Sequence, residues 1–476
     1  MPRPPSPATL AELKGAVGSG GWLESTADVA PFLSDFRRLY SGATPLVLLP
    51  RCTDEVAKLL AICHRDEVAV VPHGGNTSYC GGATPDESGS QVVISLRRLN
   101  KVRRVDAIDY SMVVEVGVTL AAAQEAAHGA ERLFPLSLGS EGTAQIGGNL
   151  STNAGGTAVL RYGMMRDLVL GLEVVLADGR IVAGLKSLRK DNTGYDVKSL
   201  FIGAEGTLGI ITAASLKLFP LPADSATALI GIDSPQRALE LLAHMRTAAG
   251  DQITTFELMP SFAVELTVKL VPGVADPSSF ACPWYLLLEL TSPNPKQNLD
   301  ALLGAELQAA AEQGIVRDAM LATSGSQAQS MWKLRESIPE AQRRHGASLK
   351  HDVSVPVSQI PALIETGSAL MRQLAPEGDV VAYGHAGDGN LHFNLSQRPG
   401  ADLQSFMARA HPLEEAMYDL VESLGGSISA EHGIGRLKAR EFAQRADPTE
   451  LAVMHSLKKA LDPKGILNPG KVLCAS

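Results

Sequence analysis

Apolar positions recur at helical spacing early in the chain and at strand spacing after it. Residues 53–66, TDEVAKLLAICHRD, carry Val56, Leu59 and Cys63 on one face and acidic residues in the first turn. This spacing predicts an amphipathic helix with Thr53 as its N-cap, because a hydroxyl there can accept a free backbone N–H.

Short apolar runs bounded by glycine and polar residues follow this helix and are typical of strands. Asp178-Gly179 lies inside one of these runs and predicts the turn of a β-hairpin. The expected strands are 68–72, 91–96, 111–118 and 209–220, with a helix at 119–130 and the hairpin at 168–185.

The pattern changes after a proline-punctuated candidate linker at 220–228. Strand-like and helical runs now alternate, which predicts an α+β domain with one antiparallel sheet covered by helices. Expected strands lie near 229–232, 254–259, 284–291, 350–356 and 379–396, and expected helices near 235–249, 296–313, 327–345 and 358–374. We expect four regions, namely an N-terminal segment 1–42, a first domain 43–221, a second domain 222–425 and a C-terminal segment 426–476 that packs back on the first domain.

Composition and charge narrow the class of protein. The 476 residues are 45% hydrophobic and 20% charged, which is ordinary for a globular protein, and the net charge of −9 argues against nucleic acid as a partner. The five scattered cysteines predict neither a disulfide ladder nor a CxxC metal pair, so a reducing compartment fits best. With no apolar leader and no long apolar run, a cytoplasmic location is expected, or a mitochondrial one if the source is eukaryotic.

Three glycine-rich loops in the first domain predict a cradle for a dinucleotide. Glycines let backbone N–H groups approach a pyrophosphate, and hydroxyl side chains add donors. One such loop alone would more often be an ordinary tight turn, but three in one domain, each joined to a strand, favour the cradle. Its expected residues are Pro72, His73, Gly74, Gly75, Asn76, Thr77, Ser78, Ser140, Gly142, Thr143, Gly147, Gly148, Ser151, Asn153, Gly155, Glu205, Gly206, Gly209, Ile210 and Ile211.

A nicotinamide site of the doubly wound type is disfavoured. No GxGxxG pattern follows a strand and opens a helix, and the segment GDGNLH (387–392) has His392 where the third glycine should be.

Two polar segments in the second half concentrate metal-ligating residues. YGHAGDGNLHFN (383–394) predicts two strands around a turn, with His385 ending the first and His392 on the second. Glu431 comes from SAEHGIG (429–435), and together these three side chains predict a site for a divalent metal of the zinc class. A lone histidine on a strand is more often a hydrogen-bonded core residue, and Glu431 alone could be a surface carboxylate.

His432 follows Glu431 directly and could act as a base beside the metal or merely support it. Arg335 and Lys350 are candidate carboxylate-binding cations, although a solvated helix face and a charged strand end describe them equally well from sequence alone.

The ordered motifs PHGGNTSYCGG, IGGNLSTNAGG and GAEGTLGIIT resemble the vanillyl-alcohol-oxidase type of FAD-binding domain. The later segments KHD, GHAGDGNLHFN, AEHGIG and LNPGK resemble the D-2-hydroxyacid dehydrogenase branch of that family. The resemblance covers about residues 40–475. It implies non-covalent FAD, because Asn76 stands where some members carry a tethering histidine, and it implies that Asn468 reaches the flavin from the C-terminus.

The same resemblance implies roles in a second site. Zn²⁺, or another divalent metal, would be held by the positions of His385, His392 and Glu431, with His432 as the base. Arg335, Lys350 and Asn394 would bind the substrate, expected to be D-2-hydroxyglutarate. Relatives specific for that acid can carry a hydroxyl residue four places after the arginine, and this chain has Pro339 there, so D-lactate or another monocarboxylate stays open.

The expected reaction is FAD-dependent oxidation of the D-2-hydroxy acid to the 2-oxo acid. Flavin reoxidation by an electron-transfer flavoprotein or a quinone is typical of such enzymes, oxygen is a further acceptor, and a homodimer is what the resemblance implies. Two other classes stay open, a metallohydrolase that uses the same His, His, Glu set and a non-catalytic flavoprotein subunit.

Overall fold

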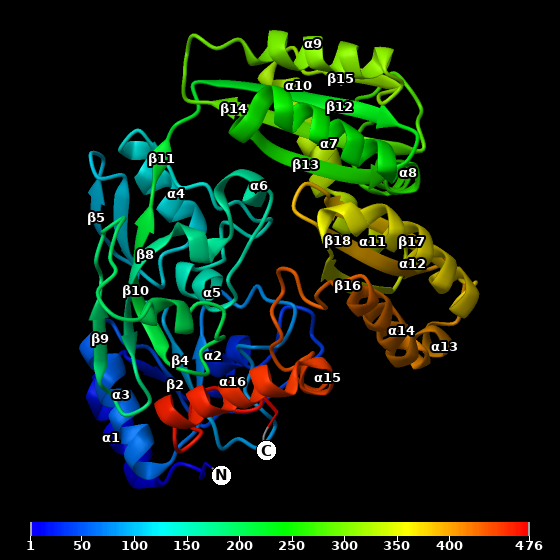
Figure 1. Cartoon of the computed structure of the whole chain (residues 1–476). Helices are drawn as coiled ribbons and strands as arrows, with labels where there is room; N and C mark the ends of the chain where they lie inside the picture. The colour runs from blue at the N-terminus through cyan, green and yellow to red at the C-terminus, as the bar shows by residue number, and fades with distance from the viewer. Residues whose placement is uncertain (1, 475–476) are drawn as a thin grey trace. The chain divides into compact units, whose positions relative to one another are not determined.

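The computed structural model describes residues 2–474, which divide into two compact units (Figure 1). The first unit runs to Gly156, resumes over Gly163–Leu221 and includes the chain from Glu431 onward. The second unit is formed by Thr157–Tyr162 and Pro222–Ala430.

The first unit contains a four-stranded sheet. Its strand β3 leads directly into the first glycine-rich loop. Its central strands are parallel and buried on both faces, as expected for the apolar runs that form them. In the order β1-β2-β4-β3, the strands are β1 Trp22–Leu23, β2 Val47–Leu48, β4 Val92–Ser95 and β3 Val70–His73.

A five-stranded antiparallel sheet forms the other half of the first unit. Its central strand β10 is buried along almost its whole length, which explains its run of small and aliphatic residues. In sheet order the strands are β5 Val102–Asp106, β6 Ser111–Glu115, β10 Ile210–Lys217, β8 Val169–Val175 and β9 Ile181–Gly184, and a separate pair joins β7 Arg132–Leu133 to β11 Phe219–Pro220.

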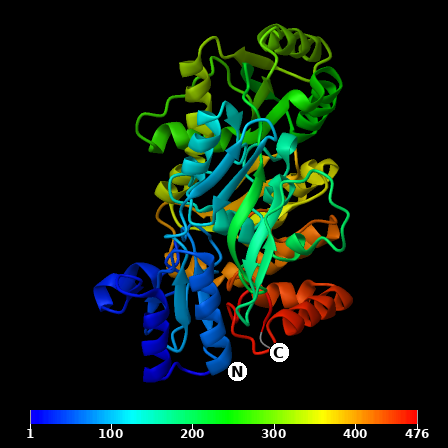
Figure 2. The same ribbon diagram turned by 90° about the vertical axis from the view of Figure 1, so that its left-hand side faces the viewer.

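Helices of the first unit pack on these sheets, and α1 lies beside α3 (Figure 2). They are α1 Pro7–Val17, α2 Thr26–Val29, η1 Ala30–Phe32, α3 Thr53–Asp66, α4 Leu120–Gly129, α5 Ile146–Ser151, η2 Met165–Leu168, η3 Val197–Leu200, α15 Ala439–Arg445 and α16 Pro448–Leu461. The C-terminal segment returns to this unit, because Val70 donates to the Ile466 carbonyl and Asn468 donates to the Val70 carbonyl.

One seven-stranded antiparallel sheet organises the second unit, as the alternating pattern predicts. Among the described residues, its two halves are joined where Glu257 and Leu258 pair with His385 and Gly384. In sheet order the strands are β15 Asp318–Leu321, β12 Asp224–Ile232, β14 Trp284–Ser292, β13 Ile253–Pro260, β17 Gly378–His385, β18 Asn390–Gln397 and β16 Ser348–Ser354.

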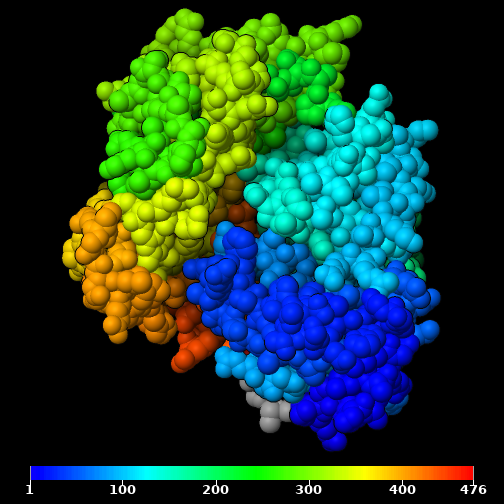
Figure 3. All heavy atoms as spheres, turned by 180° about the vertical axis from the view of Figure 1, so that it is seen from behind, coloured from blue at the N-terminus to red at the C-terminus, as the bar shows by residue number. Residues whose placement is uncertain are grey.

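Helices cover this sheet around a large aliphatic core. In the space-filling view, α13 and α14 (orange) lie at the surface beside the yellow segment that contains α12 (Figure 3). The helices are α6 Val159–Tyr162, α7 Pro235–Ala249, η4 Gly250–Gln252, α8 Ser261–Leu270, α9 Leu299–Glu312, α10 Gly325–Glu336, α11 Ile338–His345, η5 Val357–Gln359, α12 Ile360–Leu374, α13 Leu403–Ala408 and α14 Ala410–Ser423.

The structure corrects three local predictions. The helix at 53–66 is confirmed, but Cys52 is its N-cap and Thr53 is its first residue, with the Thr53 hydroxyl donating to Glu173 instead. The expected helix at 327–345 is two helices, because Pro339 in the first turn of α11 cannot continue α10. The expected linker is mostly strand, since β12 begins at Asp224.

Among the described residues, no helix is both long enough and apolar enough to cross a membrane.

Candidate active site

The hairpin of β17 and β18 positions two of the predicted metal ligands. His385 is the last residue of β17, and His392 lies in β18 opposite Tyr383. The turn between them needs glycine at Gly389, which has φ +95° and whose Cβ would meet the Val355 carbonyl oxygen at 2.2 Å. The predicted turn at 386–389 is therefore confirmed, and it brings the two imidazoles close.

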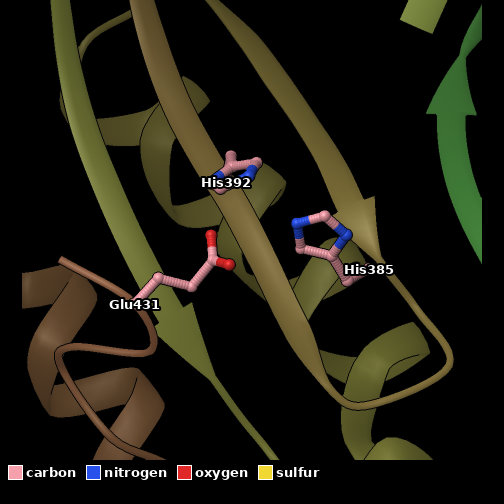
Figure 4. Close-up of side chains that lie close together, drawn as sticks. All are labelled: His385, His392 and Glu431. Atoms are coloured by element: carbon pink, nitrogen blue, oxygen red, sulfur yellow. The ribbon is translucent and has the colours of Figure 1, made fainter. Parts of the chain in front are cut away.

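Glu431 completes the cluster that the sequence predicts. One ligand atom from each of His385, His392 and Glu431 lies within 4.8 Å of the other two, and Figure 4 shows the three side chains together. Glu431 directly follows Ala430, whose N–H donates to the Asp352 carbonyl. Two imidazole nitrogens and one carboxylate oxygen are donors that suit a divalent ion of the zinc class, so the residues fit such a metal.

A buried carboxylate lies behind His385. Glu257 in β13 is fully buried, is the cross-strand partner of His385, and accepts a hydrogen bond from its Nδ1. Arg335 donates to the same carboxylate from Nε at 2.7 Å and pairs with it through Nη2 at 2.6 Å. Burial alone would raise the pKa of Glu257, but the charges of Arg335 and His385 outweigh it and hold that pKa at about 2.

A second carboxylate faces His392. Asp352 in β16 is its strand partner, with Oδ1 3.8 Å from Nδ1 of His392, and is also held by the Asn390 amide at 3.0 Å. Neither Glu257 nor Asp352 was predicted as a site residue from the sequence. A signal existed, because Glu257 is a lone charge in an apolar strand, and such a buried charge requires a partner.

The proposed substrate residues lie on or beside this hairpin. Lys350 in β16 is the strand partner of Asn394 in β18, which is buried and donates to Gln342 at 3.1 Å. Arg335 is buried in α10, and its guanidinium lies over the Tyr383 ring at 4.9 Å. The fold therefore excludes the solvated-face interpretation of Arg335, which the sequence had left open.

In the first unit, the three predicted glycine-rich loops converge. A Cβ on Gly75 would meet the Thr143 carbonyl oxygen at 2.2 Å, and one on Gly206 would meet Pro72 at 2.5 Å. Asn153 in the second loop lies 3.5 Å from the position of a Cβ on Gly203, which begins the third loop. Backbones that approach so closely require glycine and leave N–H groups near one another, as a phosphate-binding cradle needs.

Some buried polar atoms at these loops have no hydrogen-bond partner among the described residues. Both ring nitrogens of His73 and the Oδ1 atom of Asn468 are among them. Asn468 is held by its amide nitrogen, which donates to the carbonyls of Gly82 and Glu205, so its oxygen keeps a fixed direction. Burial lowers the pKa of His73 to about 4, which keeps the imidazole neutral near pH 7. These groups fit a bound cofactor that carries both donors and acceptors.

Glu205 makes a contact that the sequence did not predict. Its carboxylate accepts the backbone N–H groups of Ile434 at 2.7 Å and Gly435 at 2.9 Å. Ile434 is two positions after His432 and three after Glu431. Burial raises the pKa of Glu205, and the two N–H groups only partly oppose this. Glu205 therefore anchors the loop that carries a predicted metal ligand and the predicted base.

The other predicted cofactor residues lie in the same loops. Two asparagines among them are held by hydrogen bonds of their side chains. The Asn76 amide donates to the Ser34 carbonyl at 2.8 Å, and Asn153 accepts from the Arg166 N–H at 2.8 Å. Asn76 and Asn153 both have positive φ, at 54° and 51°.

His432 packs edge-on against Tyr79, with ring centroids 4.6 Å apart. Tyr79 belongs to the first glycine-rich loop. Glu431, which precedes His432 in the chain, accepts the N–H of Gly156 at 2.6 Å. The structure thus places the predicted base on the same loop as the predicted ligand and against the first of the cofactor loops.

Family models match both halves of the chain. Residues 44–184 match the FAD binding domain, and residues 221–472 match the C-terminal domain of FAD linked oxidases.

Curated relatives are similar over nearly the whole chain. D-2-hydroxyglutarate dehydrogenase of Arabidopsis thaliana, a mitochondrial protein, is 38% identical over 92% of this chain and 77% of its own. The mitochondrial enzyme of the same name from Bos taurus is 38% identical over 98% of this chain and 83% of its own. The D-2-hydroxyglutarate dehydrogenase of Stutzerimonas stutzeri is 33% identical over 98% of this chain and 99% of its own.

Solved structures share the fold. p-Cresol methylhydroxylase superposes with a TM-score of 0.77 at 16% identity, over 99% of this chain and 98% of that one. Alkyldihydroxyacetonephosphate synthase gives 0.75 at 20% identity, over 98% and 85%. The chain belongs to the FAD-linked oxidase family, in the branch that contains the D-2-hydroxyglutarate dehydrogenases. The predicted fold and family are confirmed, and this membership argues against a metallohydrolase.

Proposed function

We propose that this protein oxidises a D-2-hydroxy acid, with D-2-hydroxyglutarate as the first candidate, to the 2-oxo acid. The observation that carries the proposal is the cluster of His385, His392 and Glu431 in a chain of the FAD-linked oxidase family. The names of the relatives supply the candidate substrate.

Two absent groups would supply the redox and Lewis-acid chemistry. Bound FAD would accept at N5 the hydride that leaves C2 of the substrate, and a bound Zn²⁺ or similar ion would polarise the C2 hydroxyl. In the first unit, the glycine-rich loops and Asn468 would hold the cofactor without a covalent bond, because no histidine occupies the position of Asn76. In the second, His385 and His392, together with Glu431, would hold the ion.

His432 is proposed to take the proton of the C2 hydroxyl. An imidazole has an unperturbed pKa of about 6.5, which suits proton transfer near neutral pH. The edge-on contact with Tyr79 and the anchoring of the next residues by Glu205 restrict the position of the ring. Loss of this proton to His432 and of hydride from C2 together remove two electrons from the substrate and leave the 2-oxo acid.

Arg335, Lys350 and Asn394 are proposed to orient the substrate. A guanidinium can grip a carboxylate with two parallel N–H bonds, whereas the lysine ammonium acts as a point charge. Pro339 lies in the first turn of α11, four positions after Arg335, and offers no hydroxyl. We therefore propose that these cations make the contact to a distal carboxylate. D-lactate, which lacks the distal carboxylate, is the second candidate substrate.

The reduced cofactor is proposed to pass its electrons to an electron-transfer flavoprotein or a quinone, and the protein is proposed to be a homodimer. These two proposals rest on the family resemblance.

The deciding experiment is an anaerobic visible spectrum of the FAD-loaded protein during titration with D-2-hydroxyglutarate and then D-lactate. The L-enantiomers serve as matched controls. Bleaching of the oxidised flavin band by a D-acid alone supports the proposal and identifies the better substrate. A yellow protein that neither D-acid bleaches would contradict it and favour a non-catalytic flavoprotein.

A further inference from the structure

Glu257 is the cross-strand neighbour of a predicted metal ligand. It is 0% exposed, although β13 is otherwise built from uncharged residues. The backbones of Glu257 and His385 pair directly where the two halves of the seven-stranded sheet meet. The two side chains therefore project to the same face of the sheet, where Nδ1 of His385 contacts Oε1 of Glu257.

Arg335 completes this arrangement from the other side of the carboxylate. Its Nε and Nη2 atoms contact Oε2 of Glu257 at 2.7 and 2.6 Å, so the two carboxylate oxygens have different partners. The Tyr383 ring lies 4.9 Å from the guanidinium carbon, which limits the movement of Arg335. A buried carboxylate held in this way from two sides has one orientation.

A histidine that ligates a metal through one ring nitrogen almost always donates its other N–H to a hydrogen-bond acceptor, which selects the tautomer and the direction of the lone pair. Nδ1 of His385 already contacts Glu257. Nε2 is then the only ring nitrogen whose lone pair can reach an ion. His392 has a weaker version of this arrangement, because its Nδ1 is 3.8 Å from Asp352.

We propose that Glu257 is a positioning residue that sets the tautomer and orientation of His385, and that Arg335 holds the Glu257 carboxylate in place as well as facing the substrate. This inference deepens the proposed function and rests on its metal site. Arg335, Glu257 and His385 then act together in metal binding. This role is separate from the proposed contact of Arg335 with the substrate.

The test is the affinity of the FAD-loaded protein for Zn²⁺ alone, measured by competition with a chromophoric chelator after the bound metal has been removed. Glu257→Gln preserves the size of the side chain and removes its charge. We expect its affinity for Zn²⁺ to fall by about 10–100-fold, as for other outer partners of ligating histidines. The flavin content should not change, since the predicted cofactor residues lie in the other compact unit.

Glu289→Gln is the matched control. Glu289 lies in the neighbouring strand β14 of the same sheet, where it accepts from Trp332 Nε1 at 2.9 Å and from the Thr227 hydroxyl at 3.4 Å, and it contacts neither imidazole of the cluster. Like Glu257→Gln, this substitution removes a carboxylate charge and keeps the size of the side chain. We expect the affinity for Zn²⁺ to stay within about twofold of the starting protein.

A double variant separates positioning from folding. In Glu257→Gln the buried Arg335 loses its counter-ion, so the metal-free protein should unfold at a lower temperature. Glu257→Gln with Arg335→Gln removes that uncompensated charge. We expect part of the thermal stability to return while the weakened affinity for Zn²⁺ remains.

Three outcomes contradict the inference. Affinity for Zn²⁺ that is unchanged in Glu257→Gln overturns the positioning role alone and leaves the metal site in place. An equal loss in Glu289→Gln, or recovery of affinity together with stability in the double variant, shows a general effect on folding. A starting protein that binds no Zn²⁺ overturns the proposed metal site itself, and flavin reduction by a D-acid is tested separately.

Discussion

Glu205 in the first unit and Glu257 in the second are both buried carboxylates, but they have different kinds of partners. Among the described residues, the Glu205 carboxylate accepts from the backbone N–H groups of Ile434 and Gly435. Burial raises its pKa against the effects of these N–H groups and of the Lys438 charge. Glu257 has the Arg335 guanidinium and the His385 imidazole, which lower its pKa against the effect of burial. The first arrangement holds a loop in place, whereas the second orients a single side chain. Predictions that affect one arrangement and not the other test this difference.

The largest expected effect is that of His385→Ala, which acts on the second arrangement. Removal of a ligand should abolish metal binding and reduce kcat/KM by at least about 10³-fold, while the protein keeps its flavin. The measurements are metal content, flavin content and steady-state rates on one preparation. His244→Ala, a histidine paired with Glu306 at 2.8 Å between α7 and α9, should leave all three unchanged. Normal turnover without metal would remove His385 from the ligand set.

His432→Asn comes next and tests the loop that Glu205 anchors. Asparagine keeps a polar group of similar size but cannot accept the hydroxyl proton. We expect FAD and metal to remain bound and the rate of flavin reduction by the D-acid to fall by about 10²–10⁴-fold, measured by anaerobic stopped flow. An unchanged rate would show that another group is the base.

Glu205→Ala removes the acceptor of two N–H groups, a buried one of Gly435 and a partly buried one of Ile434. Each group left unpaired costs about 1–3 kcal/mol, so the melting temperature should fall. Because the same loop carries Glu431, both the retention of flavin and the affinity for Zn²⁺ should decrease, in contrast to Glu257→Gln, which should affect the metal alone. Glu205→Gln retains one acceptor oxygen and should lose less. Equal melting temperatures for all three proteins would exclude the anchoring role.

The smallest effect concerns pH and His73, which is also buried in the first unit without an ion pair. Its pKa is lowered by burial from 6.5 to about 4, so the folded state binds this proton less readily than the unfolded state does. The neutral His73 imidazole contributes to the free energy of unfolding above about pH 6.5, and this contribution is lost as the pH falls toward 4. The contribution is at most about 3 kcal/mol. His73→Gln should flatten this part of the profile of melting temperature against pH.

His128→Gln, at an exposed position of α4 in the same unit, should keep the full dependence between these pH values. A profile for His73→Gln that follows the starting protein would show that other groups cause the acid sensitivity.

Local patterns predicted much of the second unit and its hairpin. Period-2 and period-3.6 spacing identified β17, β18 and the helix α7, since these elements bury a continuous face and have clear glycine or proline boundaries. The same reasoning overlooked α8 at Ser261–Leu270 and α16 at Pro448–Leu461. Each of these segments has a proline at its start, Pro260 before α8 and Pro448 as the first residue of α16.

Residue type and short-range spacing were sufficient to nominate His385, His392 and Glu431, because metal ligands must be imidazoles, thiolates or carboxylates and two of them lie seven residues apart. The partners of these residues depend on strand register and on loops that are distant in sequence. Glu257 lies 128 positions before His385 and Glu205 lies 229 before Ile434. No local pattern encodes such a pairing, since it forms only when the core brings the two backbones together, and burial then makes a partner for each charge obligatory.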